Sequence, residues 1–72
     1  MSDTKTKERF TAHELPRVLR KMRYGVKEAW YEEENTKEYV YLELNCGQIR
    51  RVEVTGDGVA AILIDCAYAL QE

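Results

Sequence analysis

The chain has 72 residues, of which 44% are hydrophobic and 33% charged, and its formal net charge at pH 7 is −2. A chain of this length forms one domain and buries only about 60% of its unfolded surface, which leaves little room for an internal pocket. No run approaches the ~20 apolar residues that a membrane helix needs, and the start lacks the apolar stretch of a secretory signal. We therefore expect a cytoplasmic protein that does not enter a membrane.

The first ten residues are predicted to form a flexible tail, because "MSDTKTKER" is polar and charged and has no apolar periodicity. The domain is then expected over residues 11–72. A first helix is predicted within "TAHELPRVLRKMRYG", where apolar side chains recur at helical spacing at Leu15, Val18, Leu19 and Met22. Thr11 and Glu14 have the form of a capping box, whereas Pro16 favours a start nearer Leu15. Gly25 suits the helix end.

Three strands are expected next. In "VKEAWYEE" the alternation is poor, with Val26 and Trp30 on one face and Ala29 and Tyr31 on the other. "EYVYLEL" and "IRRVEV" alternate clearly and are joined by the turn "NCGQ". Their inward side chains are predicted to be Val40, Leu42, Leu44, Val52 and Val54. Their outward side chains are predicted to be Tyr39, Tyr41, Glu43, Arg51 and Glu53.

A last helix is predicted in "VAAILIDCAYALQE", after a turn in which Thr55 or Asp57 caps it. Its apolar stripe comprises Val59, Ile62, Leu63, Cys66 and Leu70, widened by Ile64 and Tyr68. Short connections favour a meander with the helices on one side. The predicted fold class is α+β: one small domain of order α-β-β-β-α, with a three-stranded antiparallel sheet and helices packed on one face.

The sequence offers little for catalysis or metal binding. Its one histidine, His13, is expected beside a helix start, and Cys46 and Cys66 are expected to be free thiols in a turn and on a packing stripe. A structural zinc site needs four ligands, so only a site shared by two copies is left open. We expect no enzyme, no catalytic residue, no cofactor and no metal.

Charge is divided along the chain. Residues 1–27 have eight Lys or Arg and three Asp or Glu, a balance of +5, whereas residues 28–45 have one Lys and six Glu, a balance of −5. Glu32, Glu33 and Glu34 are consecutive at the expected hairpin, between Trp30 and the pair Tyr39 and Tyr41. An acidic loop that keeps a hairpin soluble explains one or two of these charges. Together with the rings they are interpreted as an acidic-aromatic surface for a basic, nucleic-acid-binding protein.

Two alternatives stay open. A small regulatory protein could bind DNA or RNA through the basic face of the first helix, at Arg17, Arg20, Lys21 and Arg23, although the chain as a whole is acidic. A self-associating module could instead use the outer face of the sheet.

The element order resembles that of a known family. "ELPRVLRKM" before a first strand, "EYVYLEL" and "IRRVEV" as a hairpin, and "VTGDGVAAILIDCAYAL" as strand end, turn and closing helix are similar to a compact type among the small phage-encoded type II-A anti-CRISPR proteins, which inhibit Cas9. The resemblance runs from about Glu14 to Leu70 and consists of element order, size and acidity. It implies a phage or prophage protein in the bacterial cytoplasm.

The resemblance also implies a mechanism. Cas9-type nucleases read the PAM with arginines, and in the family acidic loops occupy that cleft and block target DNA by mimicry. The residues that would do so by position are Glu32, Glu33, Glu34, Asn35 and Glu38, with Trp30 and Tyr39 or Tyr41 at the rim. The implied partner is a Cas9-type nuclease, with its guide loaded. We expect no direct contact with nucleic acid and a monomer rather than a dimer.

Overall fold

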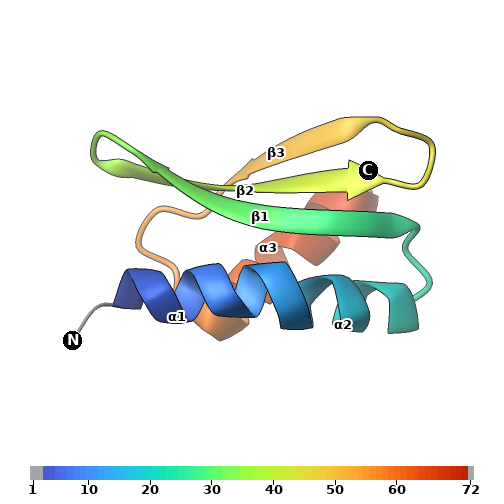
Figure 1. Cartoon of the computed structure of the whole chain (residues 1–72), viewed down its shortest axis with the longest axis horizontal. Coiled ribbons are helices and arrows are strands. Elements are labelled where there is room, and N and C mark those ends of the chain that lie inside the picture. The colour runs from blue at the N-terminus through green and yellow to red at the C-terminus, as the bar shows by residue number, and fades with distance from the viewer. Residues whose placement is uncertain (1–2, 72) are drawn as a thin grey trace.

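The computed structural model describes residues 3–71. A long N-terminal helix consists of α1 (Asp3–Arg9), the π-helical turn η1 (Phe10–Glu14) and α2 (Leu15–Lys21). The strands β1 (Val26–Glu34), β2 (Lys37–Leu44) and β3 (Ile49–Glu53) form one antiparallel sheet in that order, and α3 (Val59–Gln71) closes the chain. The N-terminal helix and α3 lie on the same side of the sheet (Figure 1). The predicted α+β class, element order and antiparallel meander are confirmed.

The N-terminal segment differs from the flexible tail that was expected over residues 1–10. From Asp3 onward the chain is helical, and residues 1–2 lie outside the described part. Lys7 pairs with Glu38 of β2, and Phe10 packs against the core. Thr11, which follows them, is fully buried. The composition of residues 1–10 does not predict these interactions, because they form only when the segment packs against the sheet.

Pro16 lies inside the long helix rather than at its start. A proline within an α-helix lacks the N–H for its hydrogen bond and clashes with the carbonyl four residues earlier. The π-helical turn η1 precedes it, and the Leu15 N–H bonds to the carbonyl of Phe10, five residues back. This wider turn carries the helix past the proline. The capping box predicted for Thr11 and Glu14 is therefore wrong: Thr11 is a buried mid-helix residue, and Glu14 makes no side-chain cap.

The helix ends at Lys21, and the left-handed residue that follows it is Arg23 instead of Gly25. Arg23 has φ 73°, in the left-handed region, and the amide of Tyr24 donates to the carbonyl of Leu19 at 3.0 Å. This is the hydrogen bond of a Schellman motif, in which glycine is the usual left-handed residue. Gly25 instead leaves room for Asn45, since a Cβ there would lie 3.2 Å from the Asn45 Nδ2 atom.

The register of β1 explains its irregular sequence pattern. Pairing with β2 shifts between Val26 and Glu28, as in a β-bulge. The shift places Val26 on the buried side together with Ala29 and Tyr31, and leaves Trp30 on the opposite side. The prediction that Val26 and Trp30 share a face is therefore wrong. The bulge accounts for the break in the alternation of the sequence.

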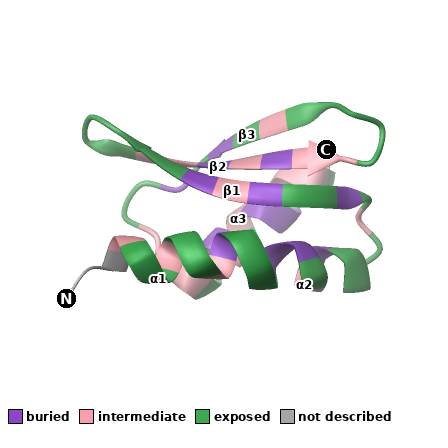
Figure 2. Ribbon diagram, viewed as in Figure 1, coloured by how far each residue is buried: buried purple, intermediate pink, exposed green. Residues whose placement is uncertain are grey.

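The core lies between the sheet and the helices (Figure 2). Its fully buried hydrophobic side chains are Leu15, Leu19, Val26, Val40, Leu42, Val54, Ile62 and Cys66. Three residues predicted to belong to apolar stripes are instead exposed: Met22 by 44%, Ile64 by 55% and Tyr68 by 65%. α3 is also tied to β3, because the Arg50 guanidinium donates to the carbonyl of Ala69 at 3.0 Å. Among residues 3–71, no helix is long and apolar enough to cross a membrane.

Candidate protein-binding surface

The helices leave one side of the sheet uncovered (Figure 1). We call this side the outer face. Strand alternation and register assign to it Glu28, Trp30, Glu32, Glu34, Lys37, Tyr39, Tyr41, Glu43, Ile49, Arg51 and Glu53. Acidic side chains outnumber basic ones on it, and three large rings lie among them.

Two rings stack at the middle of the outer face. Trp30 of β1 is directly opposite Tyr41 of β2, and their ring centroids are 5.6 Å apart with 5° between the planes. The Trp30 Nε1–H donates to the Glu32 carboxylate at 3.1 Å, which fixes the indole and places a carboxylate at its edge. Next to them, the Arg51 guanidinium lies over the Tyr39 ring, 4.7 Å from its centroid. This contact shows that a guanidinium is accommodated on these rings.

The carboxylates of the outer face have no cationic partner among the side chains that the structure describes. The one ion pair within that set joins Lys7 and Glu38, on the helix side. Glu28 and Glu43 are paired across the strands, so two like charges are adjacent. Like charges directly opposite each other destabilise a sheet slightly. The fold therefore tolerates a concentration of negative charge that does not stabilise it.

The predicted site residues divide between two sides of the hairpin. Trp30, Glu32, Glu34, Tyr39 and Tyr41 share the outer face. Glu33 is exposed but points to the helix side, since it alternates with its neighbours and pairs in register with Glu38. Asn35 is the first residue of the two-residue turn between Glu34 and Lys37. Its φ is 59°, a left-handed conformation that asparagine tolerates.

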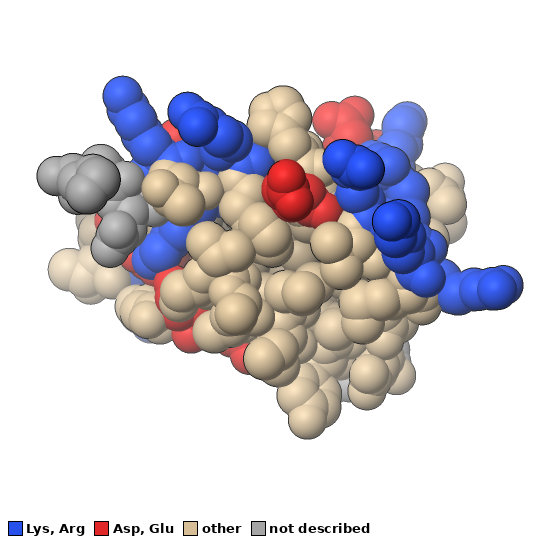
Figure 3. All heavy atoms as spheres, turned by 90° about the horizontal axis from the view of Figure 1, so that it is seen from below, with Lys and Arg blue, Asp and Glu red and all other residues tan. Residues whose placement is uncertain are grey.

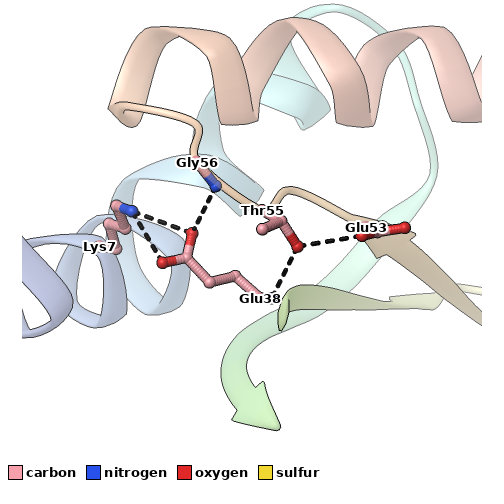
Figure 4. A network of polar contacts seen from close by, with 5 residues as sticks. All are labelled: Lys7, Glu38, Glu53, Thr55 and Gly56. Carbon is pink, nitrogen blue, oxygen red and sulfur yellow. Dashed lines mark hydrogen bonds and ion pairs between the residues drawn. The ribbon is translucent and has the colours of Figure 1, made fainter. Parts of the chain in front are cut away.

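Glu38 belongs to an internal network (Figure 4). Its carboxylate accepts from the Lys7 ammonium at 3.0 and 3.2 Å and from the Gly56 amide at 3.2 Å. Its own amide donates to the Thr55 hydroxyl at 3.0 Å, which in turn donates to Glu53 at 3.0 Å. Burial alone would raise the pKa of Glu38, but the Lys7 ammonium and the Gly56 amide outweigh it and lower that pKa. Glu38 thus joins α1 and the loop before α3 to the sheet.

Further ionisable groups lie near this network. Burial, followed by the Glu38 carboxylate, raises the pKa of Tyr31 to about 12. The neighbouring Asp65 carboxylate, toward which a protonated Asp57 would donate, and then burial raise the pKa of Asp57 to about 6. Tyr31 and Asp57 lie on the helix side, away from the outer face.

Sequence reasoning missed part of the outer face. Glu28 and Ile49 were not assigned to it, and Glu43, Arg51 and Glu53 were placed outward without being counted as binding residues. Continuing the alternation of Tyr39 and Tyr41 by two residues along β2 gives Glu43. Glu28 follows from the alternation of Trp30 and Glu32 along β1, because the register shift lies before it and changes only the side of Val26.

The two cysteines and the histidine lie on different elements of the fold. Cys46 is exposed in the turn between β2 and β3, and Cys66 is buried in α3, where burial raises the pKa of its thiol to about 12. His13 is exposed on the N-terminal helix. Within the described part of the chain, no three His, Cys, Asp or Glu side chains are grouped to hold a metal ion.

Comparisons of the chain with protein-family models, with curated proteins and with solved structures found no match. The resemblance to anti-CRISPR proteins therefore stays a hypothesis, and a functional proposal has to depend on the chemistry of the surface itself.

Proposed function

We propose that this chain is a non-enzymatic binding protein whose outer face engages a basic, nucleic-acid-binding protein. The observation that supports this proposal is the Trp30–Tyr41 stack on an uncovered sheet face, among carboxylates without cationic partners in the described chain. Large, stiff rings are the usual anchors of protein interfaces, and carboxylates accept paired hydrogen bonds from arginine. The Arg51–Tyr39 contact is an intramolecular example of the same recognition.

We further propose a Cas9-type nuclease as the partner and a phage or prophage origin for the chain. The support for this partner is the resemblance in element order, size and acidity. Such nucleases read the PAM with arginines in the major groove. Carboxylates of the outer face, with Glu32 and Glu34 nearest the hairpin tip, would pair with those arginines and exclude target DNA by occupancy. The mechanism needs no cofactor and no covalent step.

The proposed contact set is narrower than the sequence suggested. Trp30 and Tyr41 are its anchors, Glu32 and Glu34 supply charge, and Tyr39 extends the ring surface. Glu33 and Asn35 lie at its border, and Glu38 supports the fold instead.

The alternation of β1 provides a matched test. Glu32→Lys and Glu33→Lys make the same charge change at adjacent exposed positions on opposite sides of the strand. Binding of each variant to Cas9, with and without guide RNA, would be measured by biolayer interferometry. We expect Glu32→Lys to weaken binding by about 2 kcal/mol, roughly 30-fold, as for a hot-spot residue, and Glu33→Lys to weaken it several-fold less.

Two outcomes would contradict the proposal. Equal losses for the two variants would show that net charge, rather than the outer face, determines binding. No binding of the parent protein to Cas9 in either form would eliminate that partner.

A further inference from the structure

The N-terminal helix has a second charged surface, which we call the basic row. Its members recur every four residues and are all exposed: Lys5, Arg9, His13, Arg17 and Lys21. The sequence pattern hid this row, because the first two members were assigned to a tail and Pro16 was taken to mark a helix start. It becomes continuous only when α1, η1 and α2 form one helix.

The π-helical turn helps to keep the row on one side. In a regular α-helix, residues four apart drift by about 40° per step, so five members would wind nearly half-way around. The extra residue in the hydrogen-bonded ring of η1, between Arg9 and His13, rotates the following residues in the opposite sense. At ~1.5 Å per residue the row spans about 24 Å. Surface hollows run between its members, two lined by Arg9 with His13 and one by Arg17 with Lys21.

The charges of the row are not neutralised within the described part of the chain. The ion pair there uses Lys7, which points to the sheet and is not a member of the row. Arg20 is not a member of the row either. Its guanidinium donates hydrogen bonds to the carbonyls of Val26 at 3.0 Å and Lys27 at 2.9 Å. Glu8 and Glu14 are exposed beside the row and offset part of it. Seen from below, Lys and Arg side chains gather in two groups along one long edge of the helix side (Figure 3).

We propose that the basic row binds the phosphate backbone of duplex nucleic acid. A duplex presents about one negative charge per 1.7 Å, so many phosphates face a row of this length. Charge complementarity is the basis of the proposal. It stands apart from the proposed function, because the row and the outer face share no residue and lie on different sides of the molecule. The sequence had favoured no direct contact with nucleic acid, but it left open binding through the basic face of this helix at Arg17, Arg20, Lys21 and Arg23.

The acidic outer face does not prevent this binding. The molecule measures 20 Å along the axis that separates sheet from helices in Figure 1. Charges separated by more than the ~8 Å Debye length of physiological salt are largely screened from one another. Phosphates at the row therefore experience the local cations more than the distant carboxylates.

The chemistry of the row favours a polyanion over other partners. A helix that binds anionic membranes inserts an apolar side, but the apolar side of this helix, with Phe10, Leu15 and Leu19, packs against the sheet. An acidic protein partner would need apolar or aromatic anchors. Of the large side chains exposed along this helix, only Met22 at its end is such a group among the described residues.

The test is fluorescence anisotropy with mixed-sequence DNA and RNA duplexes of about 20 base pairs, at roughly 50 and 200 mM salt. We expect micromolar binding that weakens with salt. Arg9→Gln, Arg17→Gln and Lys21→Gln combined should weaken it by about tenfold or more and lower the log–log salt slope by about 3, since each phosphate contact contributes about 0.9. As a matched pair, Arg17→Gln should lower the slope by about 1, and Lys27→Gln on β1 should leave it unchanged.

The substituted side chains are exposed, so each variant is expected to fold like the parent. Thermal melting would check this. Binding of one duplex type alone would identify the source of the phosphates and still support the row. Two results would overturn the proposal: no duplex binding at low salt, whether or not phosphatidylserine vesicles are bound, or equal losses for Arg17→Gln and Lys27→Gln.

Discussion

Arg23 shows what a single residue contributes at a helix end. It occupies the left-handed region with φ 73°, where a residue with a Cβ costs roughly 1–2 kcal/mol relative to glycine. Arg23→Gly should therefore stabilise the fold, although glycine also gains freedom in the unfolded chain and so offsets part of the effect. We expect the free energy of unfolding to rise by about 0.5–1 kcal/mol, and the melting temperature by a few degrees.

Calorimetry or urea denaturation of Arg23→Gly beside Arg23→Ala measures this effect. Arg23→Ala removes the same positive charge but keeps the Cβ, so it should give no gain. If the two variants were equally stabilised, loss of charge rather than backbone strain would be responsible.

At the scale of elements, the sequence predicted those whose pattern is set locally. β2 alternates because one side faces the core, and its Val40 and Leu42 are buried as expected. The N-terminal helix was truncated in the prediction because its first turns depend on contacts with the sheet, above all Lys7 with Glu38. The pattern of β1 was misinterpreted because a bulge changes its phase, and a bulge depends on pairing with β2 rather than on local composition.

The Lys7–Glu38 pair offers a test of how α1 is held. Both side chains are mostly buried, with 12% and 16% exposed. Lys7→Met keeps the apolar stem and removes the ammonium, which leaves the Glu38 carboxylate with the Gly56 amide as its remaining donor among the contacts described. We expect urea denaturation to show a loss of about 2 kcal/mol, within the range for hydrogen bonds to charged groups.

Lys5→Met is the control for that measurement, because Lys5 is exposed on the same helix and its substitution should change stability by less than about 0.5 kcal/mol. Stability of Lys7→Met equal to that of the parent would mean that Phe10 and Thr11 alone anchor the segment.

In the folded molecule, acidic and basic side chains that form separate segments of the sequence lie on opposite sides. The acidic middle of the sequence becomes an outer face of rings and carboxylates, and the basic start becomes a row on the helix side. Sequence reasoning placed Tyr39 and Tyr41 outward because the alternation of β2 is a local property, whereas alternation did not place Trp30 of β1. It did not separate Glu32 from Glu33, because a run of like residues has no pattern of its own and its faces follow from the register of β1.

The pH dependence of stability is also a property of the whole molecule, since Asp57 lies in the loop before α3 and its pKa depends on Asp65 of that helix and on Glu38 of β2. The folded pKa of Asp57 is about 6, above its ordinary value of 3.8, so the folded state holds a proton that the unfolded chain releases. This contribution to stability is complete below the unfolded pKa and is lost as pH rises through about 6. Glu38, with a lowered pKa, acts in the opposite sense and loses its contribution as pH falls below its ordinary value of 4.5.

Asp57→Asn isolates the first contribution. Melting temperatures of the parent and the variant would be compared from pH 4 to pH 7, and their difference removes what Glu38 and other groups contribute to both. We expect the parent to lose stability relative to the variant as pH rises, because ionised Asp57 faces Asp65 and the Glu38 carboxylate. Glu14→Gln, at an exposed position, should show no such trend. A constant difference between parent and Asp57→Asn over this range would mean that the folded state does not raise the pKa of Asp57.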